Sequence, residues 1–179
     1  GWAFRRALKK VGVRVKGIVT RGRAPRRGRV LVQKARSLAA VLRATNKASH
    51  NLAAETLVRA MGRGRATGAK RRSEWPAGLA RASAVLKALG MRHFALKNGS
   101  GLHRSTTVTA ADMVRLLESV WRRPRLRRWL LPTLAVAGRS GTLARRMRGT
   151  PARGVIMGKT GTLGSVLALS GYALSPGTE

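Results

Sequence analysis

Two extended apolar runs near the C-terminus constrain the fold of this chain more than any other feature. Residues 154–159 and 165–174 are rich in Val, Ile, Leu and small residues, and only a short stretch containing Thr and Gly separates them. Runs of this length joined by a glycine-containing turn predict two antiparallel strands. We therefore expect an antiparallel hairpin in the core, with helices and further strands interleaved along the preceding sequence.

The rest of the chain carries mostly helical signals. Apolar spacing with start and stop residues predicts helices from Trp2 to Val11, from Ser37 through Leu42, from Ser49 to Gly62, from Trp75 to Leu89 and from Thr109 through Val120. Alternating apolar residues predict short strands at 13–19, 30–32 and 93–96, and a short basic helix is expected from Gly141. Residues 21–29 and 63–72, rich in Gly and Arg, are expected to form loops.

The charge balance is unusual for a folded protein. The 179 residues include 38 Lys and Arg but only 5 Asp and Glu, which gives a formal net charge of +33. Self-repulsion on this scale weakens a compact state. The hydrophobic fraction of 44% is nevertheless ordinary, so a folded core is expected.

A basic nucleic-acid-binding module is the alternative function that this charge suggests. Basic clusters at 21–29, 63–72, 122–128 and 145–153 would attract phosphate polymers without regard to sequence. None of the aromatic residues lies inside these clusters, so they contain no stacking platform, and no nucleic-acid-binding motif is present. Nonspecific binding of anionic polymers is therefore the expected consequence of the charge.

Composition excludes several other classes. The chain has no Cys, which rules out disulfides, thiolate zinc sites and cysteine nucleophiles. The three His have no metal-like spacing, so neither a metal site nor a cofactor is expected. No apolar run approaches the roughly 18 residues of a membrane span, so no transmembrane segment is predicted.

Two short motifs carry the chemistry. Ser49-His50-Asn51 stands at a predicted helix start, and Lys159-Thr160-Gly161 stands at the end of a predicted strand. Each motif is common by chance. Helix capping alone would explain Ser49 and Asn51, and a solvated surface charge would explain Lys159. Between them, however, lie Asn98-Gly99-Ser100-Gly101-Leu102 and a segment from Leu134 to Leu143 that ends in Gly-Thr-Leu, all in one order.

This ordered series resembles the low-molecular-mass class C penicillin-binding proteins, the D-Ala-D-Ala carboxypeptidases and endopeptidases of the bacterial cell wall. The resemblance implies an α+β, β-lactamase/transpeptidase-like fold, an antiparallel sheet flanked by helices, which this chain would contain incompletely at both ends. Residues 1–45 would be the end of an inserted region, and residues 46–179 the C-terminal part of the catalytic domain. The partners implied are peptidoglycan stem peptides and β-lactams, at a periplasmic or other extracytoplasmic location, without metal or cofactor.

The resemblance also assigns roles to the first motif. Ser49 would be the catalytic hydroxyl that relays a proton to the leaving amine, and Asn51 would bind the peptide backbone of the substrate. The nucleophile should come from a Ser-x-x-Lys motif, and none occurs in the 179 residues. We therefore expect the chain, as a fragment, to be inactive alone. His50 and Asn98 also stand where the family commonly has Asp.

The second motif would bind the other end of the substrate. Lys159 and Thr160 would hold the terminal carboxylate, and Gly161 would leave room for the substrate beside the strand. The backbone N–H of Thr162 would be one donor of an oxyanion hole. Two further expectations concern other residues: Glu55 is interpreted as a first-turn acid favoured by the dipole of its helix, and the four Trp are expected to be core or packing residues.

Overall fold

A computed structural model describes residues 1–23, 35–63 and 74–174, which fall into two compact units, Gly1–Ala35 and Arg36–Glu179. In the first unit, helix α1 (Trp2–Lys10) has Val11 as its C-cap and is followed by Gly12, which adopts a φ of +80°. The strand predicted at 13–19 is wrong: this segment is irregular and finds no partner strand among the described residues. The strand predicted at 30–32 lies outside the described residues, as do most of the loops predicted at 21–29 and 63–72.

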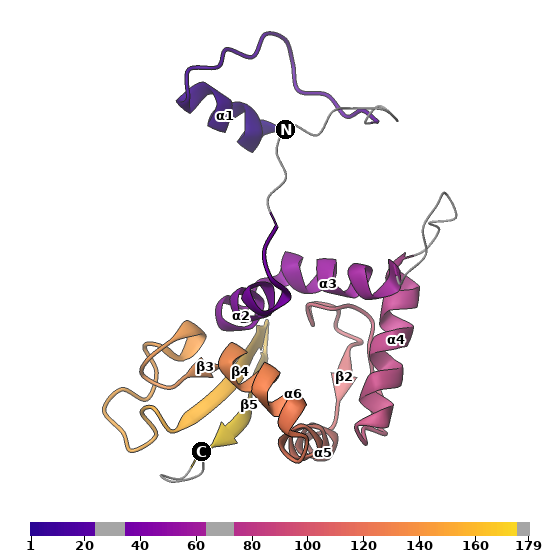
Figure 1. Ribbon diagram of the computed structural model, residues 1–179, viewed down its shortest axis with the longest axis vertical. Coiled ribbons are helices and arrows are strands. Elements are labelled where there is room, and N and C mark those ends of the chain that lie inside the picture. The colour runs from indigo at the N-terminus through magenta and orange to yellow at the C-terminus, as the bar shows by residue number, and fades with distance from the viewer. Residues whose placement is uncertain (24–34, 64–73, 175–179) are drawn as a thin grey trace. The chain divides into compact units, whose positions relative to one another are not determined.

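The second unit is built around the predicted hairpin (Figure 1). Strands β4 (Ile156–Leu163) and β5 (Val166–Ala173) pair antiparallel across a two-residue turn in which Gly164 has a φ of +55°. The short strand β3 (Ala135–Val136) pairs with the first half of β4, so that the sheet order is β3-β4-β5. The hairpin is confirmed, and β4 continues beyond the expected end through the whole Lys-Thr-Gly motif.

Helices surround this sheet and a second small one. In chain order they are α2 (Leu38–Ala48), α3 (Asn51–Arg63), α4 (Glu74–Ala88), α5 (Ala110–Trp121) and α6 (Pro124–Leu130), with β1 (Phe94–Ala95) pairing β2 (Thr107–Val108) between α4 and α5. Ser37 and Thr109 cap α2 and α5 as predicted. The basic helix expected from Gly141 is wrong, because only one 3₁₀ turn (Gly141–Leu143) forms and Met147 soon adopts a left-handed φ of +59°.

The α3–α4 contact depends on two glycines. A Cβ on Gly78 would lie 1.9 Å from the carbonyl oxygen of Val58, and one on Gly62 would lie 1.5 Å from the carbonyl oxygen of Glu74. Any side chain at either position would push the two helices apart, since real Cβ contacts of this length do not occur. The buried residues Val58, Met91, Val120, Leu134, Ala135, Ala137 and Leu143 complete the core.

The tryptophans behave differently from one another. The rings of Trp121 and Tyr172 pack with centroids 5.2 Å apart, and the guanidinium of Arg127 lies 4.8 Å from the Trp121 centroid. Interior packing is wrong for Trp2, which is 75% exposed on α1, and for Trp129, which is 48% exposed on α6. Helical spacing alone could not show that the described residues leave these two side chains exposed.

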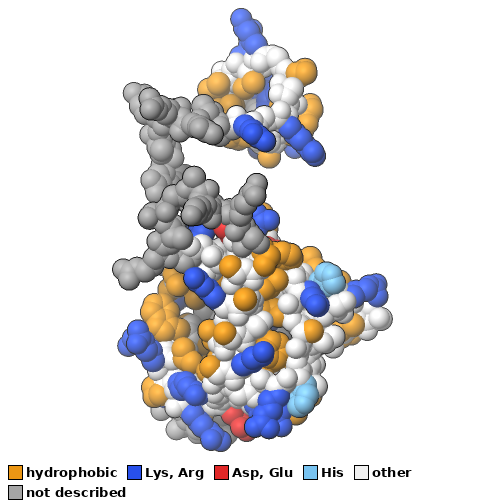
Figure 2. Space-filling model, turned by 90° about the vertical axis from the view of Figure 1, so that its right-hand side faces the viewer, with side chains coloured by type: hydrophobic (Ala, Val, Ile, Leu, Met, Phe, Trp, Pro, Cys, Tyr) orange, Lys and Arg blue, Asp and Glu red, His pale blue; other side chains and the backbone are white. Residues whose placement is uncertain are grey.

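Lys and Arg side chains are scattered over the visible face of the molecule, and very few Asp or Glu side chains appear among them (Figure 2). Two of the acids instead form surface ion pairs, Glu74 with Arg63 at 3.1 Å and Glu118 with Arg122 at 3.8 Å. Exposed pairs of this kind contribute at most about 1 kcal/mol each. The cations on this surface are therefore mostly solvated.

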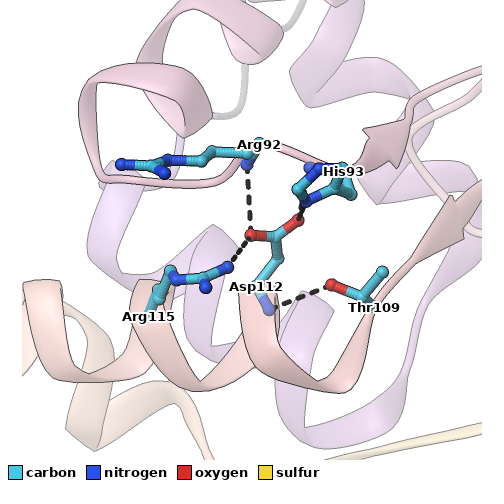
Figure 3. A network of polar contacts seen from close by, with 5 residues as sticks. All are labelled: Arg92, His93, Thr109, Asp112 and Arg115. Carbon is cyan, nitrogen blue, oxygen red and sulfur yellow. Dashed lines mark hydrogen bonds and ion pairs between the residues drawn. The ribbon is translucent and has the colours of Figure 1, made fainter.

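A third acid, Asp112, is fully buried at the start of α5 (Figure 3). Its carboxylate accepts hydrogen bonds from the backbone N–H groups of Arg92 and His93, and it pairs with the guanidinium of Arg115 at 2.8 Å. Burial opposes ionisation, but these donors outweigh it and lower the pKa of Asp112 to about 2. Thr109 therefore caps the N–H of Asp112, while the Asp112 carboxylate fixes the α4–β1 connection.

Candidate active site

Ser49 lies at the corner between α2 and α3. It is the C-terminal cap of α2 and adopts a left-handed conformation, with φ 53° and ψ 51°, which is rare for a residue other than glycine. His50 then caps α3 by accepting a hydrogen bond from the N–H of Ala53 at 3.2 Å, and Asn51 is the first residue of α3. The Ser-x-Asn motif therefore spans a sharp helix–helix corner, where Ser49 ends one helix instead of starting the next.

Lys159 on β4 reaches this corner from 110 residues away in the sequence. Its Nζ donates to Ser49 Oγ at 2.7 Å and to the carbonyl oxygen of Thr160 at 2.6 Å. Because the ammonium group is a donor only, the hydroxyl proton of Ser49 remains free to point toward a ligand. Burial lowers the pKa of Lys159 from its ordinary value of 10.5.

Beyond Gly158, one edge of β4 extends past its neighbour β3. The backbone bonds from Leu174 to Val155 and from Ala137 to Ile156 show that odd residues of β4 bond to β5, whereas even residues face the side of β3. Since β3 pairs no further than Gly158, the N–H and C=O groups of Thr160 and Thr162 face this open edge.

Gly161 is not required by packing within the sheet. A Cβ at this position would meet only the Cβ of Ala168, at an ordinary contact distance of 3.6 Å. The described part of the chain therefore leaves room for a side chain here. If Gly161 is needed, the reason lies in what approaches the strand from outside.

The loop that joins β1 to β2 lies beneath α3 (Figure 1). Glu55 on α3 holds this loop, because its carboxylate accepts from the N–H groups of Gly99 and Ser100 at 3.1 and 3.0 Å and from the Ser100 hydroxyl at 2.6 Å. Trp75 Nε1 is a fourth donor, at 3.1 Å. Burial opposes ionisation of Glu55, but these bonds outweigh it and lower the pKa of the carboxyl.

The interpretation of Glu55 as an acid favoured by the helix dipole is therefore wrong. Its carboxylate is occupied by donors from a distant loop and from α4, not by the free N–H groups at the start of α3. The sequence held one signal for this role: Glu55 follows Asn51 by four residues, which places both on one face of the helix.

The sequence reasoning also missed Thr142, in the turn after β3. Its Oγ1 lies 2.8 Å from Thr160 Oγ1. Neighbouring residues hold the turn against α2, because Lys47 Nζ donates to Ser140 Oγ at 3.4 Å and a Cβ on Gly141 would lie 2.7 Å from the Lys47 carbonyl oxygen. The hydroxyl of Thr160 is thereby fixed on the open side of β4.

These elements enclose one cleft of about 700 Å³. The helix corner, the β1–β2 loop and the second half of β4 form its walls. All the site residues expected from the sequence line it, namely Ser49, Asn51, Lys159, Thr160, Gly161 and Thr162. Among the described residues, no group of three or more His, Asp or Glu is arranged to hold a metal ion.

A Ser-x-Asn motif at a helix corner that faces Lys-Thr-Gly on a sheet edge corresponds to two of the three motifs that penicillin-binding proteins and β-lactamases share. The profile of the D-Ala-D-Ala carboxypeptidase 3 (S13) family matches residues 1–177. The chain therefore belongs to this family, which confirms the resemblance seen in the motifs.

Individual relatives agree with this assignment. The D-alanyl-D-alanine carboxypeptidase of Actinomadura sp. (strain R39) is 40% identical over 190 residues, which cover 100% of this chain and 34% of the relative. Penicillin-sensitive carboxypeptidase A of Dictyostelium discoideum is 32% identical over 143 residues, or 78% of this chain and 27% of the relative. The chain thus spans about a third of the length of these curated relatives.

A solved structure supports the fold. Penicillin binding protein 4 (dacB) from Haemophilus influenzae, in complex with a β-lactam, matches with a TM-score of 0.74 at 28% identity. The match covers 97% of this chain and 40% of that one. The expected fold class, an α+β transpeptidase-like fold with an antiparallel sheet and flanking helices, is confirmed.

Proposed function

We propose that this chain forms part of a serine D-Ala-D-Ala carboxypeptidase/endopeptidase that acts on peptidoglycan stem peptides through an acyl-enzyme and is acylated by β-lactams. One observation carries the proposal: Lys159 Nζ and Ser49 Oγ, from two motifs far apart in sequence, lie 2.7 Å apart in one cleft. Capping or a solvated surface charge would not require this meeting.

In the proposed reaction, a serine hydroxyl attacks the carbonyl of the penultimate D-Ala, and the C–N bond to the terminal D-Ala breaks. The proton that the attacking hydroxyl gives up must reach the leaving amine, and Ser49 relays it, because Lys159 leaves the Ser49 hydroxyl proton free. Asn51, at the first turn of α3, offers its amide to the substrate backbone. Water then releases the acyl group from the enzyme.

The edge of β4 would hold the substrate. Lys159 and Thr160 bind its terminal carboxylate, and the N–H of Thr162 stabilises the developing oxyanion. Gly161 admits the substrate along the strand, which agrees with the absence of any packing reason for glycine there. The second oxyanion donor would be the N–H of the nucleophile.

The nucleophile itself is the basis of the test. Because no Ser-x-x-Lys occurs in the 179 residues, the chain alone is expected to form no covalent adduct with a fluorescent penicillin. A longer polypeptide from the same gene, containing an in-frame Ser-x-x-Lys before Gly1, should form a one-to-one adduct that Lys159→Ala greatly slows. Intact-mass spectrometry measures both. An adduct on the chain alone, or none on a longer polypeptide with the motif, would contradict the proposal.

The proposal includes the organisation and location of the protein. Residues 1–45 are the end of an inserted region, residues 46–179 are the C-terminal part of the catalytic domain, and the protein works in the periplasm or otherwise outside the cytoplasmic membrane. Within the described segments, no helix is long and apolar enough to cross a membrane. The high charge would add nonspecific adhesion to anionic polymers. The family assignment does not favour the alternative of a nucleic-acid-binding module.

A further inference from the structure

Glu55 joins three elements next to the cleft, whose lining includes its neighbour Ala54 and the loop residues Gly99 and Ser100. It lies on α3, and its carboxylate binds Trp75 of α4 on one side and the Asn98–Leu102 loop on the other. Gly99 lies so close to α3 that a Cβ on it would be 2.6 Å from Val58 Cγ2 and 2.8 Å from the carbonyl oxygen of Ala54. The loop is therefore packed against α3 at the level of Glu55.

Only one assignment of donors and acceptors is consistent for the hydrogen bonds of Ser100. The Ser100 hydroxyl donates its single proton to Glu55 Oε1 at 2.6 Å, since an ionised carboxylate only accepts. Ser100 Oγ in turn accepts from Asn98 Nδ2 at 3.0 Å, and Asn98 Oδ1 accepts the N–H of Gly101 at 3.1 Å. Ser100 thus has no proton to give a ligand, and its hydroxyl serves to fix the loop.

We propose that Glu55 is a positioning residue of the cleft. Through Gly99 and Ser100 it sets the position of the Asn98–Leu102 loop, whose residues 99–102 line the cleft together with Ser49 and Asn51. The inference rests on the proposed function, because it assigns the loop to the binding of that substrate. Neither the acid–base steps nor the carboxylate site involves Glu55 directly.

The test measures the affinity of the chain for an acylated D-Ala-D-Ala dipeptide by NMR titration, without any need for the nucleophile. Glu55→Gln places an amide NH₂ against donors of the loop, and Glu55→Asp withdraws the carboxylate by one methylene. Both variants should bind the dipeptide about tenfold more weakly than the unaltered chain, the size expected for losing hydrogen bonds to a charged group. Full affinity in Glu55→Asp would show that charge alone matters and would overturn the proposal.

Two control variants separate positioning from stability. Trp75→Phe removes only the donor on the α4 side, so it should lower the melting temperature and leave the affinity unchanged. Glu118→Gln alters an exposed acid on α5 and should change neither quantity. If Glu55→Gln behaves like Trp75→Phe, with reduced stability and full affinity, Glu55 is a structural residue only and the proposal is wrong.

Amide hydrogen exchange in the absence of ligand distinguishes this inference from the proposed function. The N–H groups of Gly99 and Ser100 should exchange at least about tenfold faster in Glu55→Gln than in the unaltered chain. Failure of the unaltered chain to bind the dipeptide, with this faster exchange present, contradicts the proposed function but supports the role of Glu55 in fixing the loop. Equal exchange in both proteins overturns the inference whatever the dipeptide does.

Discussion

At the scale of single residues, the most informative group is the ammonium of Lys159. It is partly buried, its two acceptors are a hydroxyl and a carbonyl oxygen, and none of the ion pairs among the described residues includes it. Burial without a counter-ion lowers its pKa and leaves its charge incompletely compensated. A carboxylate ligand would supply the missing partner, and this gives Lys159 a measurable signature.

Lys159→Met should therefore weaken binding of an acylated D-Ala-D-Ala dipeptide by about 10- to 100-fold, the range for a charge-assisted hydrogen bond. It should also abolish the preference for the free carboxylate over the corresponding C-terminal amide. In the unaltered chain, affinity for the carboxylate should be flat near neutral pH and fall as pH rises through the lowered Lys159 pKa, beginning below 10.5. Titration calorimetry with both ligands is the measurement. An undiminished preference for the carboxylate in Lys159→Met would exclude this role.

At the scale of elements, local patterns predicted most of the structure where contacts are local, although the helix expected from Gly141 forms only one 3₁₀ turn. The hairpin, the Ser37 and Thr109 caps and the helical segments follow from spacing within a few residues. The local sequence could not predict the hydrogen bonds of Glu55, because the loop residues that donate them lie 44 and 45 positions away and approach α3 only through tertiary packing. The predicted strand at 13–19 failed for the converse reason, since this segment has no pairing partner among the described residues and β-propensity alone forms no strand.

The meeting of the two motifs could be predicted only from the resemblance. Their order in the sequence indicated a common cleft, but no local signal indicated that Ser49 would adopt a left-handed cap or that Thr142 would contact Thr160. Both depend on how α2 and the turn after β3 pack together. The identities of the candidate site residues were therefore predictable, whereas the residues that hold them in place were not.

The Asp112 network predicts how stability depends on acid. The pKa of Asp112 is about 2 in the folded protein against an ordinary value of 3.8. The stability that its ionised carboxylate contributes is therefore fully present at pH values above 3.8. This contribution is lost as pH falls from about 3.8 to about 2. Asp112→Asn should melt several degrees lower at neutral pH, because its amide NH₂ faces the N–H donors of Arg92 and His93, and should lose less stability across that acid range.

Circular dichroism melts at a series of pH values check this prediction. Glu118→Gln is the matched control, because Glu118 lies on the same helix but is exposed. Its loss should change the free energy of unfolding by no more than about 0.5 kcal/mol. A variant Asp112→Asn with the same acid dependence as the unaltered chain would show that other carboxyls, such as Glu55, govern acid unfolding.

At the scale of the whole molecule, the net charge of +33 shapes stability more than any single ion pair. The described acids are already used: Glu55 and Asp112 bind backbone N–H groups, and Glu74 and Glu118 pair with neighbouring Arg. Most cations therefore have no carboxylate partner, and their mutual repulsion destabilises the folded state. Repulsion between exposed charges is screened by salt over about 10 Å at 0.1 M.

Stability should therefore rise with salt, whereas a protein held by surface ion pairs would lose stability under the same conditions. We expect the melting temperature to increase between about 0.02 and 0.3 M NaCl, because the screening length shortens over this range and repulsion between the cations weakens. Arg125→Glu, at an exposed position in the first turn of α6, should stabilise the chain by about 0.3–1 kcal/mol at low salt. This gain should shrink as salt is added, and the charge-conserving Arg125→Lys should show neither effect. A melting temperature that falls over the same NaCl series would mean that attractive pairs, and not repulsion, dominate the electrostatics of the fold.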